Sequence, residues 1–356
     1  MMFDLPDSRT LYKALLSRDV SYDGRVYVGV TSTGIFCRLT CPARKPRFEN
    51  CRFFQTPCDC IDAGFRPCKR CKPLAAAAGE DPTVQALLAA LEERPTHRWR
   101  ERDINALGFD PSTVRRSFRR HFGMTFLEMA RQRRLREGFT TLKAGEPVIA
   151  AQIEAGFESP SAFRAAFARL TGLAPGSFRS DALLLADWID TPLGPMIAVS
   201  CAHRLHLLEF ADRKALPREM MRLAASQAGG IGFGRPAPTD QVALELNGYF
   251  AGTSDRFETP LALHGTPFQR AVWDLLRDIP AGETRSYSQI AKDLGRPSAT
   301  RAVARANGAN QLALVVPCHR VLSADGNLTG YGGGLWRKQR LIEIEAELAR
   351  ARGTAA

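Results

Sequence analysis

A chain of 356 residues is too long for one ordinary hydrophobic core, so we expect two or three domains. Hydrophobic residues make up 45% of the composition, but no apolar run approaches the roughly 20 residues that a membrane-spanning helix needs. The first ten residues lack the basic and apolar segments of a signal peptide, which predicts a cytoplasmic protein with no membrane partner.

The net charge of +12 is concentrated in the middle of the chain. Residues 94–180 carry 16 basic and 8 acidic side chains, whereas residues 181–356 carry 20 and 18. A local basic surface of this kind is typical of proteins that bind a polyanion, most often a nucleic acid. For the two ends of the chain, a merely solubilising surface is the alternative.

Seven of the nine cysteines fall within residues 37–71, in a chain that shows no export signal. Metal binding is therefore favoured over a disulfide framework. Two short-spaced pairs separated by a long loop are typical of one tetrahedral zinc ion, and the pairs are Cys37 with Cys41 and Cys68 with Cys71. On the cysteines alone, a purely structural zinc site is the default interpretation.

The residues around these pairs change that interpretation. The segments TGIFCRLTC (33–41) and GFRPCKRC (64–71) resemble the zinc domain of the Ada family of methylphosphotriester repair proteins, over about residues 22–73. The resemblance implies that Cys37 accepts a methyl group from a DNA phosphotriester, which suits a zinc-bound thiolate because it is deprotonated at neutral pH. We expect the nearby cations to hold the DNA backbone, among them Arg38, Arg44 and Lys45. No role is assigned to the remaining cysteines of this stretch, which are Cys51, Cys58 and Cys60.

A flexible boundary at residues 73–82 leads into a helical segment. Residues 104–122 predict a helix, a turn at 108–111 and a second helix with an apolar face of Val114, Phe118 and Phe122. Its other face carries four arginines, which fits contact with phosphates or the major groove. These arginines are Arg115, Arg116, Arg119 and Arg120.

A second helix-turn-helix is predicted from residues 148–156 and 159–170, with Phe163, Phe167 and Leu170 facing inward. The phrases IEAGFESPSAFRAAFARLTG and LAPGSFR resemble the AraC family of DNA-binding domains, over about residues 84–180. The resemblance implies that this domain binds a promoter operator in double-stranded DNA, and a generic helical bundle is the alternative. The expected contacts are Arg115, Arg116, Arg119, Ser161 and Arg164.

Residues 187–265 predict strands and a helix, with a hairpin at Gly194–Pro195 and a loop at 229–238. Cys201 is expected within a strand as a small buried hydrophobe. The following half is predicted to be helical. It contains a third helix-turn-helix, formed by residues 288–294, a turn at 295–297, and residues 299–309.

The motif VVPCHR (315–320), with the segment before it, resembles the O6-alkylguanine-DNA alkyltransferases over about residues 187–348. Displacement of an alkyl group at carbon needs a soft nucleophile, which Cys318 supplies. By resemblance, His319 is its base through a bridging water and Glu345 orients His319. The resemblance also implies that Asn310 holds the local backbone and that Tyr287 helps to protonate the leaving base. Arg301 would fill the place of the flipped-out nucleotide in the duplex.

One departure concerns the pocket. Members of that family often have arginine and tryptophan after the tyrosine of the GY motif, whereas Tyr331 is followed here by Gly332 and Gly333. We therefore expect a pocket wall that is wider or more mobile, which leaves the range of accepted alkyl groups open.

Together these observations predict a multi-domain α+β protein. Residues 1–78 are expected to form a zinc-binding α/β domain, and residues 82–181 an all-α AraC-type double helix-turn-helix domain. The alkyltransferase domain is expected to consist of an α/β subdomain at residues 186–265 and a helical catalytic subdomain at residues 266–350. This order of domains resembles that of the Ada family, which implies a stoichiometric methyltransferase that also activates transcription. We expect the protein to be a monomer and to have RNA polymerase as a partner. The alternative is a plain transcription factor with structural zinc, but Cys318, His319 and Glu345 occurring together argue against it.

Overall fold

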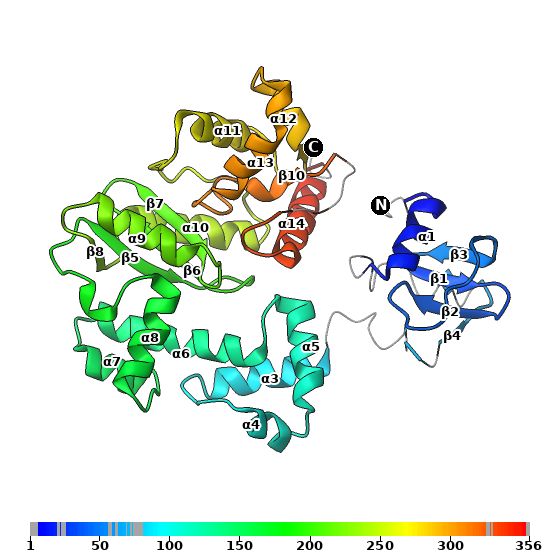
Figure 1. Cartoon of the computed structure of the whole chain (residues 1–356), viewed down its shortest axis with the longest axis horizontal. Helices are drawn as coiled ribbons and strands as arrows, with labels where there is room; N and C mark the ends of the chain where they lie inside the picture. Colours follow the sequence, from blue (N-terminus) through cyan, green and yellow to red (C-terminus); the bar gives the residue numbers. More distant parts are fainter. Residues whose placement is uncertain are drawn as a thin grey trace. The chain divides into compact units, whose positions relative to one another are not determined.

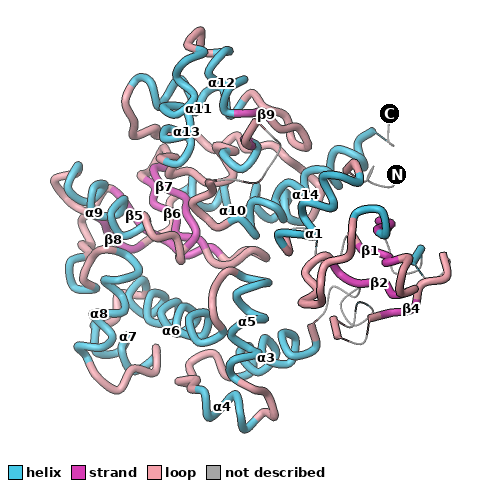
Figure 2. The backbone as a smooth tube through the Cα atoms, turned by 45° about the vertical axis from the view of Figure 1, so that its right-hand side comes forward, coloured by secondary structure: helices cyan, strands magenta, loops and turns pink. Residues whose placement is uncertain are grey.

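A computed structural model of the chain describes residues 6–19, 22, 26–55, 59–60, 63–68, 70–71, 73, 81–324, 328 and 330–353. It divides into two compact units, residues 1–88 and 89–356 (Figures 1 and 2). The boundary falls within helix α3 (Pro82–Glu93). The mixture of helices and two larger sheets confirms the expected α+β class. No helix in these ranges is long and apolar enough to cross a membrane.

The first unit is built on a four-stranded sheet in the order β3-β1-β2-β4, beside helix α1 (Ser8–Ser17). Strand β1 is antiparallel to both β2 and β3, whereas β4 runs parallel to β2. The strands are β1 (Tyr27–Val30), β2 (Ile35–Arg38), β3 (Cys51–Phe54) and β4 (Arg66–Pro67). The parallel pairing matters for function, because it brings the ends of β2 and β4 to the same edge of the sheet.

The second unit begins with the two predicted helix-turn-helix elements, which the structure confirms. The helices are α4 (Glu101–Ala106), α5 (Pro111–Phe122), α6 (Phe126–Lys143), α7 (Val148–Glu154) and α8 (Pro160–Thr171). Helices α5 and α8 have the same construction. Each starts at a capping side chain followed by proline, Asp110 for α5 and Ser159 for α8, and each ends at a glycine in the left-handed region.

A second four-stranded sheet, in the order β7-β6-β5-β8, follows in the chain. Its strands and the two helices connected to them are β5 (Leu184–Ile189), β6 (Met196–Ser200), β7 (Leu205–Phe210), α9 (Leu216–Ser226), β8 (Ile231–Phe233) and α10 (Ala237–Phe250). The β5–β6 hairpin confirms the turn predicted at Gly194–Pro195.

Three expectations for this part are wrong. The segment predicted as a loop at 229–238 contains β8, which pairs parallel with β5 because Ile231 and Phe233 have buried partners. Two helices are present where one was expected. Cys201 lies just beyond β6, because the chain turns there and its backbone N–H bonds to the carbonyl of Arg204.

Both faces of this sheet are buried, so its strands are apolar at successive positions. On β6, Met196 and Ala198 belong to one core and Ile197 and Val199 to another. The first core contains the helices of the C-terminal part of the chain. These are α11 (Pro267–Arg277), α12 (Tyr287–Asp293), α13 (Thr300–Gly308) and α14 (Leu335–Gly353), with a short parallel ladder of β9 (Arg285–Ser286) and β10 (Val321–Leu322).

The second core joins the sheet to the second helix-turn-helix. The ring of Phe139 on α6 lies 4.9 Å from that of Phe233 and 6.0 Å from that of Trp188, measured between centroids. At its margin the buried carboxylate of Asp187 accepts from Lys143 Nζ at 2.8 Å and from an Arg235 nitrogen at 3.0 Å. The helix-turn-helix and the sheet therefore share one hydrophobic interior.

We predict that Phe139→Ala lowers the free energy of unfolding by about 3–5 kcal/mol, because the ring is fully buried in this shared core. Scanning calorimetry of the full chain should show the helix-turn-helix and sheet regions melting together at a lower temperature. The control is Ile153→Ala, at a side chain that is 67% exposed, which should change stability by less than about 0.5 kcal/mol. A separate transition for the helix-turn-helix alone would contradict a shared core.

Candidate functional site

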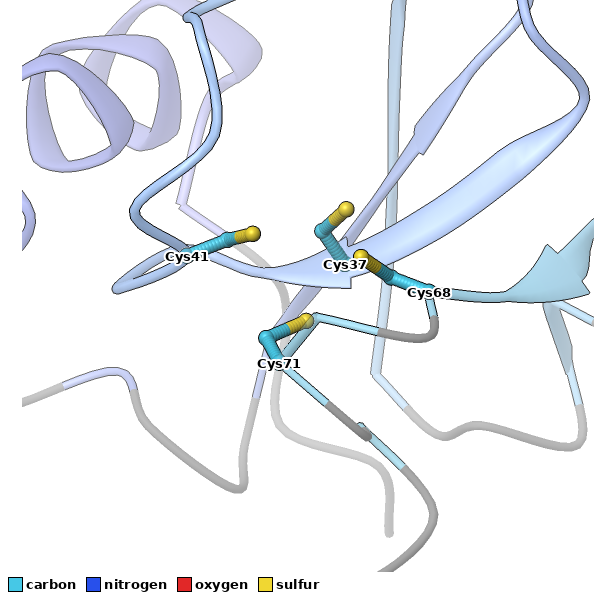
Figure 3. A group of neighbouring side chains, drawn as sticks. All are labelled: Cys37, Cys41, Cys68 and Cys71. Atoms are coloured by element: carbon cyan, nitrogen blue, oxygen red, sulfur yellow. The ribbon is translucent and has the colours of Figure 1, made fainter.

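The four paired cysteines meet at one edge of the first sheet (Figure 3). Cys37 lies on β2 and Cys41 follows that strand, while Cys68 and Cys71 follow the parallel strand β4. The backbone N–H of Cys68 donates to the carbonyl of Phe36 at 3.0 Å, which fixes the second pair beside the first. All four Sγ atoms lie within 4.8 Å of one another.

These distances fit a zinc ion. Tetrahedral ligation with Zn–S bonds of about 2.3 Å requires sulfurs about 3.8 Å apart, which small side-chain adjustments would provide. Side-chain hydrogen bonds link the four thiols. The hydrogen bond between Cys37 and Cys71 lowers the pKa of Cys71 to about 5, and the same bond together with burial raises the pKa of Cys37. The predicted ligand set is thus brought together, and a set of four thiolates is the kind that zinc prefers.

The other described cysteines of this stretch lie outside the cluster. Cys51 is half-buried and its thiol donates to the carbonyl of Arg47 at 3.3 Å. Cys60 is fully buried, and burial raises its pKa to about 12. Both act as packing residues. Cys58 lies outside the described residues.

The cations proposed to hold DNA near this cluster differ in exposure. Arg44 is exposed, and Arg38 is half-buried on β2 directly after Cys37. Lys45 is partly buried, and its Nζ donates to the carbonyls of Leu39 and Cys41 at 3.1 and 3.3 Å. Lys45 therefore closes the loop around Cys41 and has at most one N–H left for a phosphate.

On α5, the three predicted DNA contacts are all exposed and lie on the face opposite the buried Val114 and Phe118. They are Arg115, Arg116 and Arg119. The guanidinium of Arg115 pairs with Glu101, and that of Arg116 donates to the hydroxyl of Thr113. Such exposed pairs are weak and exchange readily for phosphates.

On α8, the predicted contacts Ser161 and Arg164 are exposed, while Phe163 and Phe167 are fully buried. The hydroxyl of Ser161 lies 2.7 Å from that of Ser159, the capping residue of the helix. The first turn of α8 therefore presents its polar side chains to solvent, as a helix that reads DNA must.

Cys318 lies in a fully enclosed segment, since every residue from 311 to 321 is buried. Asn310 organises this segment. Its Nδ2 donates to the carbonyl of Val316 at 2.8 Å and to Cys318 Sγ at 3.2 Å, and its Oδ1 accepts from the backbone of Leu312 at 3.0 Å. Asn307, which no sequence motif marked, donates to the carbonyl of Cys318 at 3.2 Å.

The environment of Cys318 keeps its thiol protonated in the resting chain. Burial raises the pKa of Cys318 to about 11, although the hydrogen bond from Asn310 opposes this. A thiol is a poor nucleophile, so the reaction requires a nearby group that takes its proton.

His319 has the geometry and the charge state of a proton acceptor. Its Nε2 lies 2.8 Å from Glu345 Oε1, and its Nδ1 is buried and has no hydrogen-bond partner among the described residues. Burial lowers the pKa of His319, so the ring is neutral. Because the Glu345 carboxylate accepts the proton on Nε2, the lone pair of Nδ1 remains to accept another.

Glu345 is held as an anion by more partners than the sequence predicts. Burial favours its neutral form, but His319 and Arg320 prevail and lower the pKa of Glu345 to about 2. Arg320 donates to both carboxylate oxygens, at 2.9 and 2.7 Å, and the Tyr249 hydroxyl donates at 3.0 Å. Arg320 belongs to the VVPCHR motif and could have been singled out, whereas nothing local marks Tyr249.

The cavity beside Cys318 is closed. It has room for roughly one water molecule, with a volume of about 10 Å³, so the wall is not widened in this structure. A more mobile wall stays a prediction. The space beside Gly332 is taken by Arg213, whose Nε lies 2.7 Å from where a Cβ would be, and the space beside Gly333 by Phe210 and Tyr331. The glycines let these larger side chains close in.

Two further predicted residues lie near this region. Tyr287 is half-buried at the start of α12. Its hydroxyl lies close to Gly330, which lines the cavity: a Cβ added to Gly330 would be 3.6 Å from the hydroxyl oxygen. Arg301 is exposed in the first turn of α13. The structure therefore places Tyr287 beside the pocket and Arg301 on the surface.

Comparison with known proteins gives three family profiles along the chain. They are "Metal binding domain of Ada" at residues 10–73, "Helix-turn-helix domain" at 104–181, and "6-O-methylguanine DNA methyltransferase, DNA binding domain" at 267–347. "Regulatory protein ada" of Salmonella typhimurium is 36% identical over 93% of this chain and 94% of its own length. The chain belongs to the Ada family.

A second Ada relative, the "Bifunctional transcriptional activator/DNA repair enzyme Ada" of Escherichia coli, is 34% identical over 94% of this chain and 96% of its own length. Among solved structures, the Mycobacterium tuberculosis O6-methylguanine methyltransferase is 40% identical over 46% of this chain and 93% of its own, with a TM-score of 0.41. This Ada-family chain therefore matches the two Ada relatives over nearly their whole length.

We predict that the protein binds one zinc ion through the four sulfurs of the cysteine cluster. Metal analysis should give one equivalent, and X-ray absorption should show sulfur alone in the first shell. Cys68→Ala should unfold the first unit, because metal binding and folding are coupled. The matched control Cys51→Ser, outside the cluster, should keep the metal. Nitrogen or oxygen in the first shell would contradict the ligand set.

A second prediction concerns the titration of Cys318. Because burial raises its pKa to about 11, the thiol should stay protonated through neutral pH and ionise only as the pH rises toward that value. The ultraviolet thiolate absorbance of the native chain, minus that of Cys318→Ala, should remain near zero up to about pH 10. A difference signal that saturates near neutral pH would mean that the resting site stabilises a thiolate.

Proposed function

We propose that the protein repairs alkylated DNA by moving methyl groups onto two of its own cysteines, and that one of these transfers turns it into a transcription activator. Cys318 accepts the methyl group of O6-methylguanine, and Cys37 accepts that of a methylphosphotriester. The observation that carries the proposal is the buried Cys318 with the His319–Glu345 pair directly behind it, in a chain of the Ada family.

At Cys318, the thiol proton passes through a bridging water to Nδ1 of His319, and Glu345 stabilises the imidazolium that results. A bond forms between Sγ and the methyl carbon as the bond from carbon to guanine O6 breaks. The electron pair stays on the purine, which takes a proton from the Tyr287 hydroxyl. The products are guanine and a thioether, and because no group here can cleave a thioether, each Cys318 reacts once.

The target base has to leave the stack to reach Cys318, and Arg301 on α13 takes its place in the duplex. The resting cavity of about 10 Å³ cannot hold a purine. The wall formed by Tyr331, Gly332 and Gly333 must therefore move outward as the base enters. Arg213 is the side chain that this movement would displace, since it occupies the space beside Gly332.

At Cys37, a bound zinc ion would keep the sulfur as a thiolate at neutral pH. Cys37 Sγ forms a bond to the methyl carbon while the bond from that carbon to the phosphate oxygen breaks, which leaves an ordinary phosphodiester anion. Arg38 and Arg44 neutralise that anion and its neighbours. Cys41, Cys68 and Cys71 hold the reacting sulfur in place.

The double helix-turn-helix supplies sequence-specific binding to double-stranded DNA at an operator, through Arg115, Arg116, Arg119, Ser161 and Arg164. Support comes from their exposure on α5 and α8 and from the name of the Escherichia coli relative, which includes transcriptional activation. An activator bound beside a promoter contacts RNA polymerase. We propose that the protein does so as a monomer in the cytoplasm, with four domains close to residues 1–78, 82–181, 186–265 and 266–350.

We predict that Cys318→Ala abolishes removal of methyl from guanine O6 and leaves phosphotriester repair unchanged, because the two sulfurs lie in separate compact units. Cys37→Ala should give the reverse loss. Each repair is measured as transfer of labelled methyl from DNA carrying only one kind of lesion. Cys201→Ala is the matched control and should preserve both activities. Guanine repair retained by Cys318→Ala would refute the assignment of the acceptor.

Activation is predicted to follow from a change of charge. Methylation of Cys37 turns one thiolate into a neutral thioether, which removes one negative charge close to the DNA backbone. Each nearby phosphate then gains on the order of 1 kcal/mol, so a few contacts raise operator affinity about ten- to thousand-fold.

The measurement compares operator affinity before and after exposure to methylphosphotriester DNA, at two salt concentrations, in the native chain and in Cys318→Ala. Affinity should rise in both proteins, and the rise should shrink as salt screens the phosphates. The charge mechanism fails if affinity stays flat once Cys37 is methylated, or rises only when Cys318 is present.

A further inference from the structure

Three helices of the second unit, α5, α8 and α13, are proposed to contact DNA, and α8 and α13 lie on opposite sides of one sheet. Strand residues alternate between the two cores: Met196, Ala198 and Leu208 face one, and Ile197 and Val199 face the other. The first core also contains Val303 and Ala306 of α13, whereas the second contains Phe163 and Phe167 of α8. The sheet is therefore interposed between α8 and α13.

Helices α8 and α13 each bury an apolar face in the core on their own side of the sheet and expose their cations. On α8, Phe163 and Phe167 are fully buried and Arg164 is exposed. On α13, Val303 is fully buried while Arg301 and Arg305 are exposed. In both Figures 1 and 2, α7 and α8 lie at one end of this unit and α12 and α13 at the other, with β5, β6 and β7 in between.

Close contacts tie the second helix-turn-helix to the sheet and to α9. Besides the shared core, the carboxylate of Asp187 on β5 is paired with Lys143 on α6. Gly172, which ends α8, fits so closely against α9 that a Cβ there would lie 2.1 Å from the carbonyl oxygen of Pro217. The end of α8 is therefore packed tightly against the start of α9.

We propose that one molecule of this protein binds two DNA duplexes at once, an operator across α5 and α8 and a damaged duplex across α12 and α13. The proposal rests on the DNA contacts given under Proposed function. A straight duplex that lies along one side of the sheet cannot also reach the other side, so the two surfaces take separate duplexes.

Electrostatic repulsion between the two duplexes does not prevent this. A helix layer and a sheet layer are each about 10 Å thick, so helix, sheet and helix separate the duplexes by roughly 30 Å. The Debye length is about 8 Å at physiological ionic strength, so the repulsion is screened across that distance. An activator bound at its operator thus keeps Cys318 available for lesions on other DNA segments.

The test uses the full chain with Cys37 methylated and with Cys318→Ser, which accepts no methyl group and lets the complex accumulate. Duplex A is selected from a random library for binding to this protein. Duplex B, of different mass, carries one O6-methylguanine. Native mass spectrometry should show protein, A and B in a 1:1:1 complex, and the Kd for B should change less than about two-fold when A is saturating.

Variants identify which surface holds which duplex. Arg164→Ala should weaken binding of A at least ten-fold and leave B unchanged, and Arg301→Ala should do the reverse. Arg340→Ala, at an exposed arginine of α14, is the matched control and should affect neither duplex.

The possible failures are distinguishable. If A and B each bind alone but compete, or appear together only in complexes with two protein molecules, the two-duplex proposal is overturned while the individual contacts stand. If Arg164→Ala or Arg301→Ala leaves its own duplex bound as before, the proposed contact itself is wrong, and the two-duplex proposal falls with it.

Discussion

The burial of Cys318 is the constraint on which the catalytic half depends. Polar groups that are removed from water need partners, and the segment around this thiol meets that need through Asn310, which binds two backbone groups as well as Sγ. The same burial suppresses ionisation of the thiol, so a base is required, and His319 is neutral for the same reason. A buried neutral ring needs one fixed tautomer, which Glu345 provides.

The two proposed acceptor cysteines would form a thiolate in different ways. Cys318 is buried and protonated in the resting chain, and in the proposed reaction His319 takes its proton through a water. Cys37 is half-buried in a cluster of sulfurs suited to a cation, and a zinc ion bound there would stabilise its thiolate before any DNA arrives. This difference fits their separate tasks, because only a change of charge at an accessible site can alter how the protein binds a polyanion.

The fold was predictable where side-chain periodicity is strong and where caps are regular. The spacing of Phe163 and Phe167, with a proline and a glycine at the helix ends, is sufficient to predict α8. Strand β8 was missed because the glycines in and around it favour a loop, and only the tertiary partners of Ile231 and Phe233 make it a strand. The four zinc cysteines were predictable from spacing.

The remaining features depend on contacts that a sequence does not display. Tyr249 reaches Glu345 across 96 positions, and Arg213 closes the cavity beside Gly332, where the sequence suggested open space.

The central claim, that two sulfurs of one chain accept methyl groups from two kinds of lesion, is tested most directly by locating the methyl groups. The protein would be incubated with DNA carrying deuterated methyl on guanine O6 and on backbone phosphates, then digested for peptide mass analysis. One deuterated methyl group should be found on Cys318 and one on Cys37, whereas label on any other cysteine, or on only one of these two, would contradict the account.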